Sequence, residues 1–296
     1  MKKALSFLLL AALLTAPLVG CDTADQGDEP TKTTTESKDN TIPEYNAADA
    51  NPASDFEYKV GEDGEIIITK YVGTDTDVVI PEKIDGKDVK VIGQRSFKEN
   101  QTVVSVLIPD TVWLIDEAAF VYCKNLTTVR LSRGLEVINV SAFDSCKKLS
   151  NIRLPASLTH IGERAFAMCE SLKQITIPAS CYRNDAKEYY ISMFYAFAYS
   201  GLETVVIEEG VQFIPSFAFC ETNIKEIVIP ASVEKIPSDA FNGAVQLQKV
   251  FFEGNAPANH AVSFCKKADH TFTVYYHEGA EGFTSPEWNG YKTEIW

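Results

Sequence analysis

The sequence has little positive charge and no long apolar run. It has 27 lysines and arginines against 41 aspartates and glutamates, which gives a net charge of -14 at pH 7. Proteins that bind nucleic acid need clustered positive charge to replace phosphate counterions, so this balance argues against that class. The longest apolar run, Ala4 to Leu14, has about eleven residues, whereas a membrane-spanning helix needs about 20. The composition is that of a soluble folded protein, 45% hydrophobic and 23% charged.

Signatures of catalysis are missing as well. The sequence has no Gly-x-Ser-x-Gly, no Walker loop and no His-Glu-x-x-His. His260 and His270 flank Cys265 at a spacing that zinc sites do not use, and His160 occupies a variable position that we expect to be exposed. We therefore predict no enzyme activity, no metal site and no cofactor. An enzyme of unknown type stays as a remote alternative, because the carboxylate pairs that hydrolyse glycosides have no sequence signature.

The N-terminus has the pattern of a targeting segment. Lys2 and Lys3 precede the apolar run, and Leu18-Val-Gly-Cys21 follows it. This ending resembles the lipobox of bacterial lipoproteins, which implies cleavage before Cys21 and a lipid on Cys21. The alternative is an ordinary secretory signal that ends in a cysteine. We predict a signal peptide over residues 1–20 and an extracytoplasmic protein, lipid-anchored to a bacterial membrane at the cell surface.

An acidic stretch separates this segment from the rest of the chain. Residues 22–55 contain nine acids and two lysines, with few large apolar residues. Such a composition does not bury enough surface to offset its ordering entropy, so residues 21–55 are predicted to be a disordered tether. Folding should begin near Phe56, and residues 56–88 are predicted to form the N-terminal cap of a repeat structure.

The dominant feature of the chain is a repeat of about 23 residues, marked by a phenylalanine that follows Ala or Ser. These phenylalanines are Phe97, Phe120, Phe143, Phe166, Phe197, Phe219, Phe241 and Phe264. One copy has too few apolar residues to fold alone, but stacked copies share a core. The pattern predicts a β-rich solenoid with one short parallel strand per coil and irregular or 3-10 return segments. Residues 89–279 are the repeats, with an insertion near 181–190, and residues 280–296 are the C-terminal cap.

Two columns of side chains are expected inside this solenoid. The small residue before each phenylalanine favours close approach of the coils, so that each Phe ring packs on the next. Cys123, Cys146 and Cys169 also share one column. Neighbouring coils, about 5 Å apart, are within disulfide range, but three cysteines in a column do not all pair, and other coils have small residues there. We predict buried free thiols.

The repeat Leu-x-x-Ile-x-Ile-Pro-x-Ser-Leu-x-x-Ile-Gly-x-x-Ala-Phe-x-x-Cys resembles the BspA-like leucine-rich repeat, over roughly residues 57 to 296. The resemblance implies a leucine-rich-repeat solenoid on a bacterial surface that contacts proteins. Members of the family are described as adhesins for host matrix proteins or other cells. No ligand motif carries over to this chain. The expected function is an adhesin or receptor that binds an extracellular protein without catalysis, with a glycan-binding surface protein as the alternative.

The strand face offers the candidate binding residues. Alternation directs Ile175 and Ile177 inward and Gln174 and Thr176 outward. The outward column that contains Thr176 has two arginines and ends in two aromatics, which are residue types that anchor protein interfaces. The candidates are Arg130, Arg153, Val206, Val228, Phe251 and Tyr275. Two questions stay open: whether the C-terminal cap folds over Phe251 and Tyr275, and whether the insertion near 181–190 is a neutral loop or an aromatic protrusion for a partner.

Overall fold

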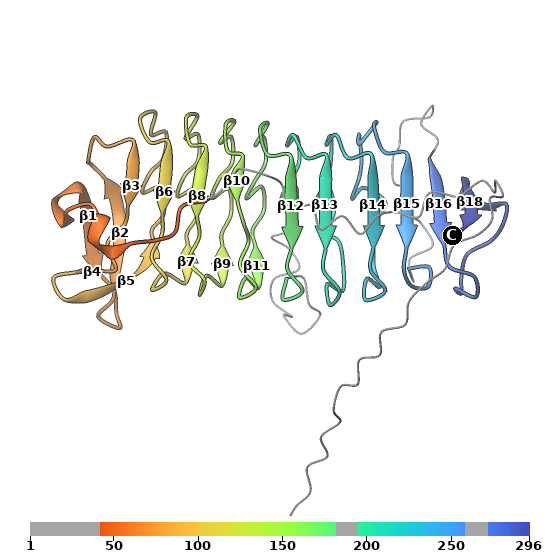
Figure 1. Ribbon diagram of the computed structural model, residues 1–296, viewed down its shortest axis with the longest axis horizontal. Coiled ribbons are helices and arrows are strands. Elements are labelled where there is room, and N and C mark those ends of the chain that lie inside the picture. The colour runs from red at the N-terminus through yellow and green to blue at the C-terminus, as the bar shows by residue number, and fades with distance from the viewer. Residues whose placement is uncertain (1–41, 182–193, 258–271) are drawn as a thin grey trace, which may run out of the picture. The chain divides into compact units, whose positions relative to one another are not determined.

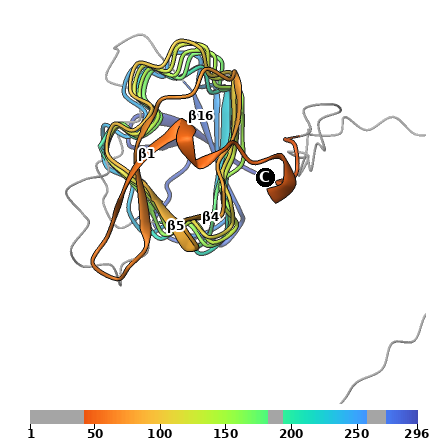
Figure 2. The same ribbon diagram turned by 90° about the vertical axis from the view of Figure 1, so that its left-hand side faces the viewer.

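The computed structural model describes residues 42–181, 194–257 and 272–296. These described residues form a solenoid of stacked coils. Figure 1 shows the solenoid from the side and Figure 2 shows it from the end. This confirms the predicted fold class. Its wider strand wall, the front wall, is parallel throughout except for β17 (Glu287–Trp288), which pairs antiparallel with β18. The other front-wall strands are β3 (Asp77–Val79), β6 (Ser105–Leu107), β8 (Thr128–Arg130), β10 (Asn151–Ile152), β12 (Gln174–Ile177), β13 (Thr204–Ile207), β14 (Glu226–Ile229), β15 (Lys249–Phe252), β16 (Thr273–Tyr276) and β18 (Tyr291–Ile295).

A second strand wall lies on the return side of the first coils, which corrects the expectation of one strand per coil. This back wall begins with the antiparallel hairpin of β1 (Phe56–Val60) and β2 (Ile66–Tyr71). Its other members are β4 (Lys83–Ile84), β5 (Lys87–Ile92), β7 (Leu114–Ile115), β9 (Val137–Ile138) and β11 (His160–Ile161). The return segments stack in constant register, such as Val137 opposite His160, so their backbone groups also pair between coils. Beyond β11, the described residues continue this wall through an isolated bridge from Phe213 to Lys235.

The core follows the predicted phenylalanine column. Phe120 and Phe143 stack with ring centroids 5.1 Å apart and nearly parallel planes. Phe166 and Phe197 keep the same stacking at 5.4 Å, although 31 rather than 23 residues separate them. The stack of core rings therefore continues across this longer interval. The predicted insertion near 181–190 lies outside the described residues, apart from the buried Cys181.

The cysteine column is confirmed as buried free thiols. The Cys146 thiol donates to the Phe120 carbonyl of the preceding coil at 3.1 Å, and Cys123 bonds Phe97 in the same way at 3.0 Å. Burial raises the pKa of the Cys146 thiol, so it stays protonated and keeps this donor. The thiols therefore satisfy backbone carbonyls inside the core.

The N-terminal edge of the front wall is closed by residues that the sequence places in the predicted tether. Asn51 is buried beside Val79 of the edge strand β3. Its backbone N–H donates to the Val79 carbonyl at 2.9 Å, and its Oδ1 accepts from the Val79 backbone N–H at 2.8 Å. Two short 3-10 helices, η1 (Ala47–Asp49) and η2 (Ala53–Asp55), flank it. An open strand edge needs backbone partners, and Asn51 provides them. Residues 42–55, upstream of Phe56, are thus part of the folded chain.

Candidate partner-binding face

The outer side of the front wall is where the repeat leaves side chains free. In β12, Ile175 and Ile177 are buried, whereas Gln174 and Thr176 are exposed, as alternation predicts. Parallel pairing places Thr176 opposite Val206 and Gln174 opposite Thr204. Each outward position therefore forms a column across the wall, and the columns together form one face.

The first strands of this face are covered by residues 42–50, here called the N-terminal arm. The arm crosses the outer side of the front wall (Figures 1 and 2). The Tyr45 hydroxyl donates to the Ile80 carbonyl at 2.9 Å, and the Arg130 guanidinium lies 5.5 Å from the Tyr45 ring centroid. Burial, with the nearby charge of Glu82, raises the pKa of Tyr45 to about 12, so this hydroxyl stays a donor.

Arg130 is consequently not the exposed anchor that the sequence suggested. It is buried, and its Nη1 donates to the Ile108 carbonyl at 2.7 Å and to Asp110 Oδ1 at 2.8 Å. The Tyr45 ring lies over the same guanidinium, so all of these contacts of Arg130 are intramolecular. The prediction of Arg130 as a partner-binding residue is wrong, because both the arm and Asp110 occupy it.

Asp110 forms ion pairs with two arginines at this end of the face. Besides Arg130, it accepts from the Arg133 Nε at 2.6 Å and from the Arg133 backbone at 2.9 Å. Burial alone would raise the pKa of Asp110, but the hydrogen bonds from Arg130 and Arg133 outweigh it and lower the pKa to about 2. Asp110 is therefore a fixed negative charge that holds two arginines.

The C-terminal strands of the face are also closed. The exposed fraction of Phe251 is 3%, because its ring stacks on Tyr275 at 4.7 Å and meets the edge of Trp296 at 5.0 Å. Tyr275 is half-buried in the same stack and stands opposite Glu294 of β18. The cap does cover these aromatics, so the prediction that Phe251 and Tyr275 anchor a partner is wrong for Phe251 and weakened for Tyr275.

Between the two covered ends, no described segment lies over β10, β12, β13 and β14, and this part of the face is here called the open window. Arg153 is exposed, the exposed fraction of Val206 is 47%, and Val228 is half-buried. At a strand spacing of about 4.8 Å the window is about 14 Å wide. Its outward residues are Asn151, Arg153, Gln174, Thr176, Thr204, Val206, Glu226 and Val228. Three of the six candidate residues, Arg153, Val206 and Val228, thus lie together on one accessible surface.

Sequence reasoning missed a second group of exposed side chains. Tyr122, Met168 and Tyr199 each follow a core phenylalanine by two positions and have exposed fractions of 45%, 38% and 47%. All three have positive φ values of 57–61°, at the turn that reverses the coil. Nearby, Tyr195 and Phe217 stack at 4.6 Å. The signal was available in the sequence, because the register of the phenylalanines also fixes this column.

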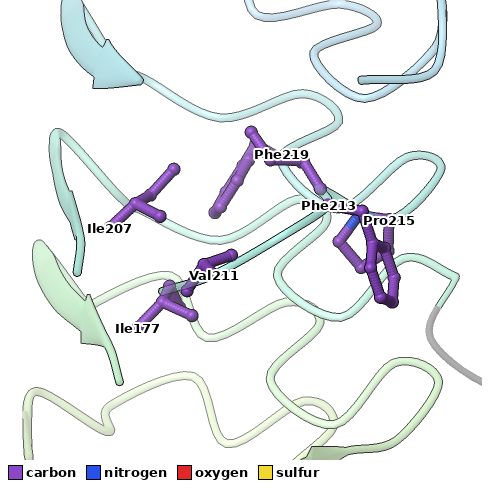
Figure 3. Close-up of a pocket in the computed structure, with 7 residues that line it drawn as sticks. Ile177, Ile207, Val211, Phe213, Pro215 and Phe219 are labelled. Atoms are coloured by element: carbon purple, nitrogen blue, oxygen red, sulfur yellow. The ribbon is translucent and has the colours of Figure 1, made fainter. Parts of the chain in front are cut away.

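Two features describe the chemistry of the interior along the described residues. His160 was expected to be exposed, but it lies in β11 and is buried, which lowers its pKa and favours the neutral ring. A narrow gap inside the coils near β12 and β13 has an entirely apolar lining (Figure 3). Its lining residues are Ile177, Ile207, Val211, Phe213, Ile214, Pro215 and Phe219. None of these side chains carries a group that activates or orients a substrate.

The described residues also show no group of three or more His, Cys, Asp or Glu that is placed to hold a metal ion. Across the same part of the chain, no helix is long and apolar enough to cross a membrane. Arg130 and Arg133 gather around Asp110 at the edge of the open window and form an arginine cluster there.

Comparisons with known proteins agree with this geometry. The model of the BspA type leucine rich repeat region matches residues 76–192 and 190–273, in 6 copies. A leucine rich cell surface protein from Faecalibacterium prausnitzii A2-165 is 29% identical with a TM-score of 0.56, over 69% of this chain and 54% of that one. The chain thus spans about half the length of that protein. A leucine rich repeat protein from T. pallidum is 26% identical with a TM-score of 0.51, over 77% of this chain and 85% of that one.

No protein with a curated description matches the chain in sequence. The family match nevertheless covers well over half of the residues and coincides with the stacked coils that the structure shows. The spacing of the phenylalanine ladder, the parallel front wall and this match lead to one conclusion: the chain belongs to the family of BspA-type leucine-rich repeat proteins.

Proposed function

We propose that this chain is a lipid-anchored bacterial surface protein that binds an extracellular protein through the open window, without catalysis. The observation that carries the proposal is the window itself. The arm and the C-terminal cap cover the two ends of the front wall, whereas the outward residues of β10, β12, β13 and β14 stay accessible. Solenoids use such continuous faces to bind partners.

The composition of the window supports a protein partner. Arg153 is a frequent type of interface anchor, and Val206 gives an apolar spot among hydroxyl and amide side chains. Thr176 and Thr204 supply donors and acceptors without large rotamer entropy. The similar F. prausnitzii protein is described as a cell surface protein, which supports an adhesin-like or receptor-like role toward host matrix or another cell.

The anchor of the proposed surface protein is the lipid on Cys21. The experiment is metabolic labelling with a fatty acid in a bacterial host, followed by separation of membrane and soluble fractions. The wild type should incorporate the label and sediment with membranes, and Cys21→Ser should do neither. Labelling of Cys21→Ser equal to that of the wild type would contradict the lipoprotein assignment.

The binding role is tested on arrays of extracellular proteins. The double variant Thr176→Glu, Val206→Glu places two like charges at opposite positions in the middle of the window. It should reduce capture at least about tenfold, because the apolar contact at Val206 becomes a buried charge without a partner. Glu136→Arg changes an exposed side chain beside the back-wall strand β9 and is the matched control. Equal capture by the double variant and the wild type would contradict binding through the window.

A glycan-binding role is the second candidate, and the exposed Tyr122 and Tyr199 favour it, because sugar rings stack on aromatic faces. A glycan array probed with Tyr122→Ser and Tyr199→Ser separates the two functions. Loss of a glycan signal in these variants, with the window variant unaffected, would favour the glycan role over the protein-binding one.

A further inference from the structure

One coil beyond the Asp110–Arg130 contact, the equivalent positions are both arginines, Arg133 and Arg153. Asn151 pairs with Thr128 and Ile152 with Val129, so the coils here are related by a shift of 23 residues. The same shift takes Asp110 to Arg133 and Arg130 to Arg153. Repeat geometry therefore directs Arg153 toward Arg133, where the preceding coil joins Arg130 to Asp110 at 2.8 Å.

These two arginines have unused hydrogen-bond capacity. Arg133 directs one edge of its guanidinium at Asp110, and the exposed fraction of its side chain is 82%. Arg153 is exposed, and no residue in the described part of the chain forms an ion pair or hydrogen bond with its side chain. Two like charges in this register repel each other unless an anion lies between them. The cluster is also unusual in a chain with a net charge of -14.

The arm shows what kind of ligand this chemistry accepts. Residues 42–46 have no regular secondary structure, Asn46 has an extended backbone, and Tyr45 lies over the Arg130 guanidinium. The negative charge of Glu44 is close enough to raise the pKa of Arg133, after the larger contributions of Asp110. The arm thus places an aromatic ring on Arg130 and the charge of the preceding acidic residue in the neighbourhood of Arg133. Arg153 extends the same column into the open window.

We propose that Arg133 and Arg153 form a binding site for an extended acidic-aromatic peptide segment of a protein partner. The carboxylate of the segment lies between the two guanidiniums, as Asp110 does beside Arg130, and its aromatic ring stacks on Arg153 as Tyr45 does on Arg130. The site lies at the N-terminal edge of the open window. This proposal rests on the proposed function and specifies the chemistry of the partner that binds to the window.

The test uses fluorescence anisotropy with the full chain and a labelled peptide, Thr-Ile-Pro-Glu-Tyr-Asn, which copies residues 41–46. The wild type should bind it, with weaker binding at high salt. Arg153→Ala should weaken binding at least about tenfold, and Arg153→Lys by a smaller factor, because a lysine lacks the planar fork. A peptide with Gln and Ser in place of Glu and Tyr should bind as weakly as the wild-type peptide binds Arg153→Ala.

Lys148→Ala is the matched control, because Lys148 is an exposed cation of the same coil that donates to Asn125, away from the arginine pair. It should bind the peptide as the wild type does. Unfolding midpoints of all variants should agree, since Arg153 is exposed and its side chain forms no hydrogen bond or ion pair with a described residue.

Three results would overturn the proposal. The first is no binding by the wild type at millimolar peptide, and the second is equal binding by Arg153→Glu, which would mean that the peptide exchanges with the arm at Arg130. The third is Arg153-dependent binding of a sulfated oligosaccharide but not of the peptide. Each of these, combined with loss of array capture in the Thr176→Glu, Val206→Glu variant, removes this site and leaves the proposed function in place.

Discussion

Release of the N-terminal arm is the change whose effect can be worked out most directly from the structure. Tyr45 holds the arm through one hydrogen bond to the Ile80 carbonyl and one cation–π contact with Arg130. A net hydrogen bond contributes about 1 kcal/mol, and a partly desolvated cation–π contact adds about 1 kcal/mol. Tyr45→Phe should therefore weaken arm docking about fivefold and Tyr45→Ala about 30-fold.

The readout is the accessibility of Arg130 to an arginine-specific reagent such as phenylglyoxal, followed by mass spectrometry. Arg130 is buried under Tyr45, whereas Arg153 in the same column is exposed and provides an internal reference. The rate at Arg130 should rise in Tyr45→Phe and further in Tyr45→Ala, with the rate at Arg153 unchanged. Tyr122→Ala removes an exposed tyrosine and should change neither rate. An unchanged Arg130 rate in Tyr45→Ala would refute the arm as the cover.

Two further predictions concern stability. The Ser96 hydroxyl is buried with no hydrogen-bond partner among the described residues, at a position where the next coil has Ala119, so Ser96→Ala should raise the free energy of unfolding by about 1 kcal/mol in urea titrations; a decrease would show a hidden hydrogen bond. The pKa of Asp110 falls from 3.8 to about 2 on folding, so its contribution is complete above about pH 4 and disappears as the pH drops toward 2. After allowance for solvent screening this contribution is about 1 kcal/mol, and Asp110→Asn should remove that part of the acid dependence; an identical pH profile for the variant would contradict it.

The covered ends of the front wall change how the strand face should be understood. A bare column of outward residues suggests that every coil contributes equally to binding. Tyr45 of the arm covers Arg130 at one end, and Trp296 packs against Phe251 at the other. The proposed binding is therefore expected on the middle coils. Any comparison of ligand specificity should focus on Arg153, Thr176 and Val206.

The sequence determined the solenoid on its own, because its period is visible residue by residue. Spacings near 23 between phenylalanines require coils that stack, and small residues before each ring require close approach. The stacked rings, the buried thiols and the inward and outward alternation in β12 all follow from that period. Local pattern was sufficient here, since each coil contacts only its neighbours.

Tertiary structure alone decided which outward residues are accessible. Arg130 and Phe251 have the same register as Arg153 and Val206, so no periodicity separates them. Their burial depends on two segments outside the repeat, the arm around Tyr45 and the last residue, Trp296. The tether prediction failed at Asn51 for the same reason, because a polar residue of low hydrophobicity becomes ordered when it completes an open strand edge. Repeats specify the core, whereas irregular segments that pack on it from a distance in sequence determine the surface that a partner meets.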